Sequence, residues 1–313
     1  MLLVDYHNLL HRGIHPNKPK IIENPDFLFH VSLTMILNLA EKFGASRHNP
    51  MVLCNDSKPS WRHSYYTENS KDFPEYEGQT YKGNRTKDET IPWDRINEIN
   101  DEVLEALRLH SDFHVVKVPL CEADDIIAVL AKYCDDSGIP CNIVSTDGDF
   151  VQSQTSIVKL FNPIKNSFYP EVDIAEYKKL HILLAGDDNI KNVKRGLGEK
   201  TVMKLLPRLD EELAINPEMR KRFEFNQNLI DFEKIPEYIR VSIMDEWKTQ
   251  EGKYNYHAMN LIKLFRKYSL NAIGEKVISF KLQENKRETS FNTHYKKTNE
   301  LEEWANKGLE NFF

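Results

Sequence analysis

Short runs of β-branched and apolar residues recur along the first half of the chain, with longer amphipathic stretches between them. The runs that predict buried strands lie at residues 2–4, 51–54, 113–118 and 142–145. Apolar positions at helical spacing predict helices at residues 27–43, 94–109 and 122–134. Strands that alternate with helices favour a parallel arrangement with right-handed crossovers. We therefore expect an α/β fold with a mostly parallel central sheet flanked by helices.

The second half of the chain has a different pattern. Two short runs around Asn166 predict a hairpin that extends the sheet. From Asp173 onward we expect helices joined by short turns, at about 174–185, 199–206, 210–222, 237–248 and 255–268. The stretch 283–298 is polar. These patterns predict an α/β domain at residues 1–180 and a helical region at residues 181–313 with a polar tail.

Residues 57–90 differ from both halves, because they contain almost no aliphatic side chains but many aromatic and basic ones. A segment of this composition cannot build a core of its own. It interrupts the α/β pattern directly after Asp56. We therefore expect a mobile functional loop inserted into the domain.

Composition fits a water-soluble globular chain. Of the 313 residues, 40% are hydrophobic and 29% are charged, and no run is long enough to span a bilayer. The first residues have no basic leader and Asp5 interrupts their apolar run, so we expect no signal peptide. The four cysteines show no C-x-x-C spacing, which favours buried thiols in a reducing, cytoplasmic compartment.

The net charge of −6 argues at first against a nucleic-acid partner, because Lys and Arg drive phosphate binding. The charges are not evenly spread, however. Residues 191–208 contain six basic residues and one acidic residue. Acids and bases therefore gather in separate places, as expected for a metal site beside phosphate-binding surfaces.

Each predicted strand of the first half is followed at once by an acidic residue. These residues are Asp5, Asp56, Glu122 and Asp147. The carboxyl ends of parallel strands meet at one edge of the sheet, where such folds bind ligands. We therefore expect the four carboxylates to share one rim.

Two motifs add further acids to this rim. In TDGD the glycine between Asp147 and Asp149 permits a tight turn, and in EADD the acids Glu122, Asp124 and Asp125 begin a helix. Either motif alone could be a simple cap of a helix or turn. Together they predict a site for two Mg²⁺ ions, with Mn²⁺ as a substitute, because hard cations take oxygen ligands. No Cys and His pattern of the zinc type competes.

A third acidic stretch, LAGDDNIKNVKRGLGEKT at residues 184–201, places Asp187 and Asp188 ahead of GLG. The glycines permit a turn whose backbone N–H groups could bind a phosphate at the start of the helix from Glu199. The simpler alternative is a glycine cap between two helices. The surrounding Lys and Arg favour the phosphate.

These motifs together resemble the flap endonuclease or 5′-to-3′ exonuclease family, and within it the phage ribonucleases H. The motifs LLVDYHN, VLCND, YKGNR, CEADD, STDGDF and GDDNIKNVKRGLGEKT occur in the family's order over roughly residues 1–205. The resemblance implies a PIN-like or resolvase-like nuclease core, a helical arch within 57–90 and a helix–three-turn–helix element. It also implies that the family's metal-binding acids correspond to Asp5, Asp56, Glu122, Asp124, Asp125, Asp147 and Asp149, with Asp187 and Asp188 as further candidates.

The resemblance also implies which residues bind DNA. Lys82 and Arg85 of YKGNR would contact the scissile phosphate and, with Asp147 and Asp149, form the catalytic set, while Tyr81 would stack on a base. Phosphate contacts around the GLG turn would come from Lys191, Lys194, Arg195, Gly196, Gly198, Lys200 and Thr201. A monovalent cation would fit at the turn from Gly196 to Gly198. Other aromatic residues of the insertion either stack on displaced bases or attach the arch to the domain; these are Trp61, Tyr65, Tyr66 and Tyr76.

One motif departs from the family. The family reads G-D-x-x-D-N, whereas the two acids here are adjacent. If Asp188 is the first acid, Lys191 occupies the second position; if it is the second, the first falls on Ala185. This departure puts the shell of the second metal in question.

The implied function is a metal-dependent 5′ nuclease that removes RNA primers or DNA flaps during replication, with ribonuclease H activity on RNA–DNA hybrids. Its substrates would be forked or flapped duplex DNA and RNA–DNA hybrids, and the chain would act as a monomer in the host cytoplasm. The alternatives are a PIN-type ribonuclease and a non-catalytic DNA-binding scaffold. The ending NKGLENFF has the spacing of a peptide that docks on a replication sliding clamp through Asn306, Leu309, Phe312 and Phe313, or folds back on the helices. A single-strand-binding protein is the other expected partner.

Overall fold

The computed structural model describes residues 1–85, 88–185, 190–193, 198–254 and 257–270. Within these ranges, six strands form one sheet in the order β3-β2-β1-β4-β5-β6. They are β1 (Leu2–Asp5), β2 (Met51–Asn55), β3 (His114–Lys117), β4 (Cys141–Val144), β5 (Val158–Asn162) and β6 (Ser167–Phe168). The first five are parallel, and β6 pairs antiparallel with β5. The predicted mostly parallel sheet and its hairpin are confirmed.

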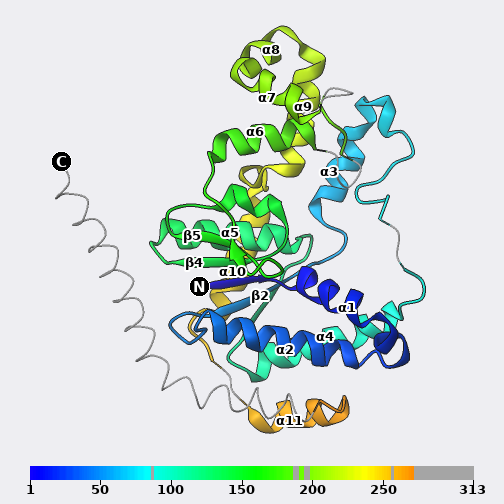
Figure 1. Ribbon diagram of the computed structural model, residues 1–313, viewed down its shortest axis with the longest axis vertical. Helices are drawn as coiled ribbons and strands as arrows, with labels where there is room; N and C mark the ends of the chain where they lie inside the picture. Colours follow the sequence, from blue (N-terminus) through cyan, green and yellow to red (C-terminus); the bar gives the residue numbers. More distant parts are fainter. Residues whose placement is uncertain (86–87, 186–189, 194–197, 255–256, 271–313) are drawn as a thin grey trace, which may run out of the picture.

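The α-helices cover both faces of this sheet and extend beyond it (Figure 1). Those before the sheet's fourth strand are α1 (Tyr6–Glu23), α2 (Phe27–Lys42), α3 (Trp61–Asn69), α4 (Trp93–His110) and α5 (Ala123–Asp136). Those that follow the hairpin are α6 (Ile174–Leu184), α7 (Glu199–Leu205), α8 (Leu209–Ile215), α9 (Pro217–Ile230), α10 (Glu237–Gln250) and α11 (Ala258–Lys267). Short 3-10 turns connect several of them, including Gly148–Ser153 and Phe232–Lys234.

Two helix predictions were wrong. No helix was predicted over residues 6–23, where α1 lies, and this helix contains Pro16 and Pro19, although proline disfavours a helix interior. Burial of Leu9, Leu10 and Ile14 against the sheet overrides this local cost. The single helix expected at 210–222 is two helices, because Asn216 caps α9 by accepting a hydrogen bond from Met219 N, with proline at the first helical position.

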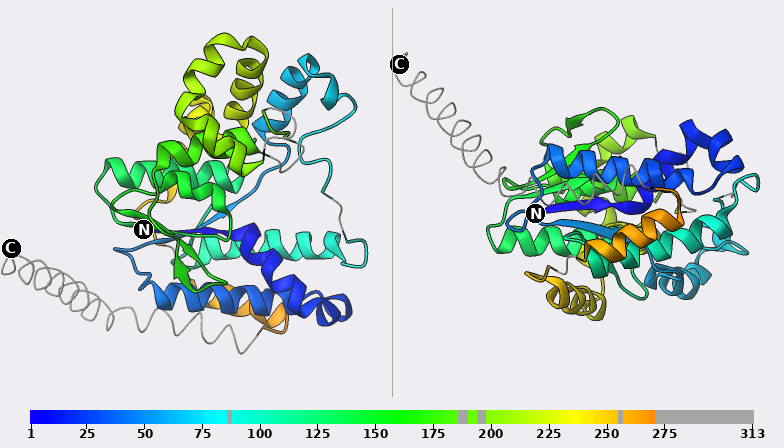
Figure 2. Two further views of the ribbon diagram at one scale, coloured as in Figure 1. Left: turned by 45° about the horizontal axis from the view of Figure 1, so that its top comes forward. Right: turned by 90° about the horizontal axis from the view of Figure 1, so that it is seen from below.

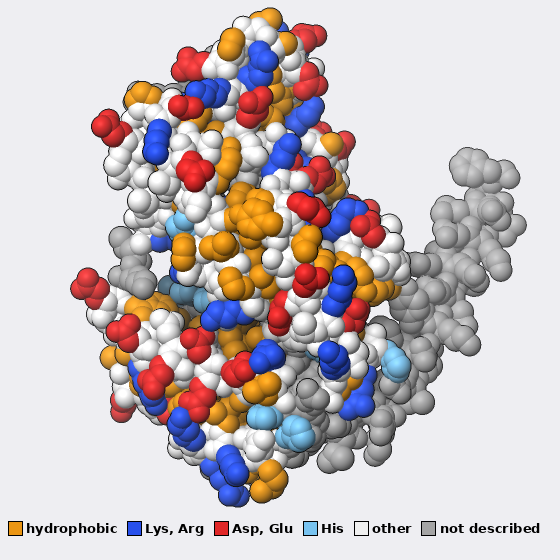
Figure 3. All heavy atoms as spheres, turned by 180° about the vertical axis from the view of Figure 1, so that it is seen from behind, with side chains coloured by type: hydrophobic (Ala, Val, Ile, Leu, Met, Phe, Trp, Pro, Cys, Tyr) orange, Lys and Arg blue, Asp and Glu red, His pale blue; other side chains and the backbone are white. Residues whose placement is uncertain are grey.

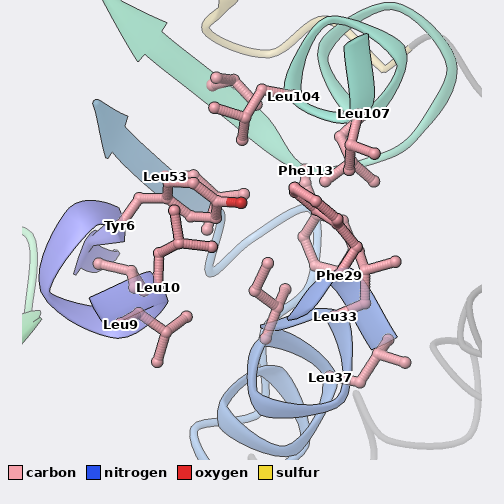
Figure 4. Packing of buried hydrophobic residues seen from close by; sticks show 14 of the residues in the cluster. Tyr6, Leu9, Leu10, Phe29, Leu33, Leu37, Leu53, Leu104, Leu107 and Phe113 are labelled. Carbon is pink, nitrogen blue, oxygen red and sulfur yellow. The ribbon is translucent and has the colours of Figure 1, made fainter. Parts of the chain in front are cut away.

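Helices lie above and below the sheet in the left view of Figure 2. A hydrophobic layer is buried against each face of the sheet. One layer lies between the sheet and helices α1, α2, α4 and α11, where Phe29 and Leu33 of α2 face Leu10 of α1 (Figure 4). The other layer lies under α5 and α10, where Ile127 and Trp247 are buried with Val52 of β2. Alternate residues of each strand enter opposite layers, so the central strands are apolar on both faces.

The insertion does not behave as the composition predicted. Part of it forms α3, and its aromatic residues Tyr66, Phe73 and Tyr76 are buried around Phe225 of α9. The Tyr66 and Phe225 rings lie 5.8 Å apart, and those of Tyr76 and Phe225 lie 5.4 Å apart. The segment lacks a core of its own, as expected, but it completes one with α9. We call this group the arch-base cluster.

The structure also bears on the predictions for the cysteines, for membrane-spanning helices and for the domain boundary. All four cysteines are buried free thiols, as predicted. Within the described ranges, no helix is long and apolar enough to cross a bilayer. The predicted boundary at residue 180 falls inside α6, which contacts residues 148–153 as well as α7 and α9, and the division into two domains stays a prediction.

Candidate active site

A small, partly open cavity of about 60 Å³ lies at the carboxyl edge of the sheet. Its acidic lining comes from Glu122 and Asp124, at the start of α5, and from Asp147 and Asp149, in the turn after β4. Its basic lining comes from Arg62, Lys82 and Arg85 of the insertion, together with His181 of α6. The structure therefore brings the acids of EADD and TDGD together with the basic residues of YKGNR, although these motifs are far apart in the sequence.

Asp5 and Asp56 lie next to this cavity but are not among its lining residues. Asp5 ends β1 and accepts hydrogen bonds from Asn8 N at 3.1 Å and Ser145 Oγ at 2.8 Å. Asp56 follows β2 and accepts one from Ala123 N at 2.7 Å, at the first residue of α5. Both carboxylates therefore connect the strand ends to the segments that carry the cavity acids.

Burial, with a smaller contribution from mutual repulsion, raises the pKa values of three of these acids. Burial, together with the charges of Asp56 and Asp147, raises the pKa of Asp5 to about 7. Burial and the neighbouring Asp149 raise the pKa of Asp147 to about 6. Burial also raises the pKa of Asp124, with Asp5 and Asp147 contributing. Like charges this close favour protonation unless a cation is bound between them.

Glu122 is the exception, because basic side chains surround it. Its carboxylate accepts from Lys82 Nζ at 2.9 Å and from Arg62 Nη1 at 3.3 Å. Ser60 Oγ and Tyr81 Oη also donate to it, at 3.2 Å and 3.4 Å. Burial acts to raise the pKa of Glu122, but the charges of Arg62 and Lys82 outweigh it and lower the pKa to about 2.

A tight turn directs Lys82 into the cavity. Gly83 N donates to Thr80 O at 3.0 Å, and Lys82 has a left-handed backbone with φ of 57°. A Cβ atom at Gly83 would lie 2.2 Å from Thr80 Oγ1 and 3.0 Å from Thr80 O, so a larger residue would force the turn to shift. The YKG sequence therefore fixes the position of the ammonium group.

Arg62, which the sequence analysis missed as a site residue, connects three elements. Its side chain is 3% exposed, and Nη1 lies 2.7 Å from Asp125 Oδ1 while Nε donates to Leu229 O of α9 at 2.9 Å. Asp125 also accepts from Trp61 Nε1 at 3.1 Å and is fully buried. Asp125 thus lies outside the cavity lining, and its predicted role as a metal ligand has a structural alternative, the ion pair with Arg62.

The structure also shows how far the aromatic side chains of the insertion are buried. Trp61, Tyr66 and Tyr76 are buried, so in this structure they attach the insertion to the domain and present no free ring face. Tyr81 is 7% exposed, and its hydroxyl reaches Glu122. Its ring is covered in this structure, and its stacking on a base stays a prediction. Tyr65 is half-buried and stacks on Phe225 at 5.9 Å.

His181 is the second site residue that the sequence analysis missed. Its Nε2 atom lies 2.9 Å from Asp149 Oδ1. Burial acts to raise the pKa of Asp149, but the hydrogen bond and charge of His181 outweigh it, so the pKa is lowered. No sequence motif contains His181. The available signal was its spacing of four from Tyr177 on a helix that follows the sheet.

The stretch after α6 is described only in part. Ala185 and Ile190 line the cavity with apolar side chains. Lys191 faces the insertion, where its backbone N–H donates to Tyr76 Oη at 2.8 Å and its ammonium group bonds to Glu75 O. Gly198 caps α7, and Lys200 and Thr201 are exposed in its first turn. The remaining predicted residues lie outside the described ranges; they are Asp187, Asp188, Lys194, Arg195, Gly196, Asn306, Leu309, Phe312 and Phe313.

Surface charge is mixed on the face opposite to that of Figure 1. There the described acidic and basic side chains are interspersed (Figure 3). Basic side chains therefore also occur away from the cavity. The basic residues of the cavity differ from these others in that they lie beside its acidic residues.

The donor set fits a hard divalent cation. Glu122, Asp124, Asp147 and Asp149 offer oxygen atoms. Burial and nearby acids raise the pKa values of Asp124 and Asp147, and a cation would stabilise their charged forms. Within the described residues, no three His, Cys, Asp or Glu side chains are already close enough to hold an ion. Small side-chain movements would therefore accompany binding.

Comparison with known proteins gives consistent results. The family profile described as 5′-3′ exonuclease, N-terminal resolvase-like domain, matches residues 1–179. The chain is 30% identical to ribonuclease H of Enterobacteria phage T4, over 75% of this chain and 80% of that protein. It is 28% identical to the thermostable DNA polymerase I of Thermus aquaticus, over 66% of this chain and 23% of the polymerase.

Solved structures share the fold. The 5′-exonuclease of phage T5 with bound zinc aligns with a TM-score of 0.53 and 18% identity, over 90% of this chain and 98% of that one. The T5 flap endonuclease in a complex with DNA and metal ions aligns with a TM-score of 0.55 and 18% identity, over 89% and 98%. At this identity the likeness concerns the fold alone.

Proposed function

The chain belongs to the 5′-3′ exonuclease family, and from this premise we propose that it is a Mg²⁺-dependent 5′ nuclease that cleaves flapped DNA and RNA–DNA hybrids. The observation that carries the proposal is the cavity in which Glu122, Asp124, Asp147 and Asp149 face Lys82 and Arg85. The relative named ribonuclease H and the neighbour crystallised with DNA and metal ions support the substrate class.

The cavity acids would hold the divalent cations, with Asp5 and Asp56 as neighbours. When bound, a pair of such ions activates water and neutralises charge on a phosphate. The acids alone would repel DNA, since unneutralised carboxylates beside phosphates only raise the free energy of binding. Metal dependence is therefore part of the proposal.

Lys82 and Arg85 would position the scissile phosphate. A positive charge aimed at developing negative charge lowers the barrier by about 3 kcal/mol or more. In this structure the Lys82 ammonium group is paired with Glu122. We propose that Lys82 exchanges this carboxylate for the substrate phosphate when cations bind Glu122.

The exposed basic residues Lys200 and Arg208 would contact duplex phosphates, as part of the predicted helix–three-turn–helix element. Four buried free cysteines fit a reducing compartment, and we place the reaction in the cytoplasm, of a host cell if the source is a phage.

One assay tests the proposal. A 5′-labelled flap and a 5′-labelled RNA–DNA hybrid are incubated with the full chain in Mg²⁺ or in EDTA. The proposal requires release of short products from the 5′ end in Mg²⁺ and none in EDTA. Cleavage confined to single-stranded RNA would favour a PIN-type ribonuclease, and binding without cleavage would favour a non-catalytic scaffold.

A further inference from the structure

His181 packs against Tyr177, which is itself attached to the TDGD turn. Its ring stacks on that of Tyr177 at 5.8 Å with an interplanar angle of 13°. The Tyr177 hydroxyl donates to Gly148 O at 2.8 Å, inside the TDGD turn. The helix that carries the imidazole is therefore fixed against the turn that carries Asp147 and Asp149.

The imidazole lies where it could bind the same cation as the carboxylate of Asp149. Nε2 of His181 lies 2.9 Å from Asp149 Oδ1, at the lining of the cavity. Two ligands on adjacent corners of an octahedron with bonds of about 2.1 Å lie about 3.0 Å apart. In this structure the separation is that of a hydrogen bond between Nε2 and the carboxylate. A cation that replaces the bridging proton would find both atoms at the spacing of two adjacent ligands.

His181 lies in the cavity wall beside apolar residues. The described residues that follow α6 along this wall, Ala185 and Ile190, are apolar and offer no side-chain oxygen. The imidazole is half-buried and lines the open cavity, so it is accessible to an ion. Its nitrogen would add a ligand of a different kind to the acids of the cavity.

We propose that His181 is a nitrogen ligand of the divalent cation that Asp149 would hold, and that it makes this site prefer Mn²⁺ to Mg²⁺. Both ions favour oxygen ligands, but Mn²⁺, as a transition-metal ion, accepts an imidazole nitrogen more readily than Mg²⁺ does. This inference rests on the proposed function, because it assumes that the cavity binds divalent cations.

The test measures coordination directly. Mn²⁺ is added to the full chain, and electron spin echo envelope modulation detects nitrogen bound to the ion. Wild type should show a ¹⁴N coupling that changes when the protein is made with ¹⁵N-labelled histidine, and His181→Gln should abolish it. The matched control is His7→Gln, because His7 Nδ1 also lies near a predicted ligand, 3.5 Å from Asp56 Oδ2. This control should keep the coupling.

Calorimetric titration separates ligation from positioning. His181→Gln should weaken Mn²⁺ binding about 10-fold or more and Mg²⁺ binding less than about threefold. Equal losses for both ions would show that His181 only orients Asp149 and would overturn the inference. Mn²⁺ binding without a histidine coupling in wild type would also overturn it and leave the proposed function standing. Failure of wild type to bind either ion would instead reject the proposed function.

Discussion

Nζ of Lys82 lies 2.9 Å from Oε1 of Glu122, so a basic residue of the insertion is paired with an acid of the candidate metal site. The pair therefore holds a residue proposed to position the phosphate against a residue proposed to bind the metal, without any substrate. It also keeps a long, flexible side chain at the point where a phosphate would arrive. Lys82 is only 20% exposed, which reduces the freedom it has to lose on binding.

Replacing Lys82 should therefore impair catalysis more than folding. We expect Lys82→Gln to lower the single-turnover cleavage rate of a 5′-labelled flap by about 100-fold or more, because a charge near the phosphate is lost. The matched control is Lys71→Gln, an exposed lysine of the same insertion, which should cleave at the wild-type rate. Equal effects of the two substitutions would show that general charge, and not position, matters.

Gly83 provides a separate test of how Lys82 is positioned. Gly83→Ala adds a Cβ atom 2.2 Å from Thr80 Oγ1 and 3.0 Å from Thr80 O, so the Thr80 hydroxyl must rotate and the turn must give slightly while the charge is kept. We expect a cleavage rate about 10-fold lower than wild type, since small displacements of catalytic groups are costly. Gly78 has a positive φ but nothing within 4 Å of an added Cβ, so Gly78→Ala controls for backbone strain alone. Similar rates for both variants would contradict the steric argument.

Asp147 should show opposite effects on stability and on activity. Its pKa is raised to about 6 by burial and Asp149, so the charged form destabilises the metal-free fold. For a carboxyl group with a raised pKa, this cost is complete above pH 6 and disappears as the pH falls toward 4. In EDTA at pH 8, Asp147→Asn should raise the free energy of unfolding by about 1–2 kcal/mol, and this gain should vanish near pH 4.

The same substitution should abolish cleavage in Mg²⁺, because an amide binds a hard cation poorly. Urea unfolding and the flap assay, made on one preparation, measure both quantities. A variant that is less stable than wild type in EDTA would show that Asp147 is not under repulsion.

Arg62 should be necessary for stability. Removing it leaves Asp125 buried without its cation, and breaking a buried pair costs about 3–5 kcal/mol. We expect Arg62→Met to lower the free energy of unfolding by this amount, and Arg62→Met with Asp125→Asn to recover part of it. If the double variant is as unstable as the sum of both single ones, the ion pair carries no coupling energy.

His114 should make the protein sensitive to mild acid. It is buried beside Trp247, with ring centroids 5.4 Å apart, and burial lowers its pKa to about 4. Between pH 6.5 and 4 the unfolded chain binds a proton that the folded chain does not, so stability falls as the pH is lowered through this window. His114→Phe should reduce the stability loss between pH 7 and pH 4.5 by about 2 kcal/mol.

The control for His114 is His48→Phe, at an exposed position. Urea unfolding at several pH values gives the comparison. The same pH profile in wild type and His114→Phe would show that acid sensitivity originates elsewhere.

The sequence predicted the sheet and its acidic rim because both follow from local pattern. Apolar runs that end in carboxylates predict strand ends, and parallel strands bring those ends together. Long-range packing could not be predicted in the same way. The contact of Arg62 with Leu229 O joins residues far apart in the chain, and no local pattern encodes it. His181 was missed because one imidazole on a helix gives no motif.

The insertion shows the limit of composition. Aliphatic-poor segments lack a core, and this rule predicted a mobile loop from residue 57 to residue 90. The rule could not include Phe225, which comes from α9 and completes the arch-base cluster. A segment can therefore be ordered by a distant element that its own composition does not reveal.

Helix α9 contacts both walls of the site through different residues. Phe225 packs in the arch-base cluster, Asn226 Nδ2 donates to Ile182 O and Lys191 O, and Leu229 O accepts from Arg62. One helix therefore fixes the insertion, α6 and the segment at Lys191 relative to one another. Substitutions on its inward face should therefore displace the insertion or α6, even where the replaced side chain lies outside the cavity.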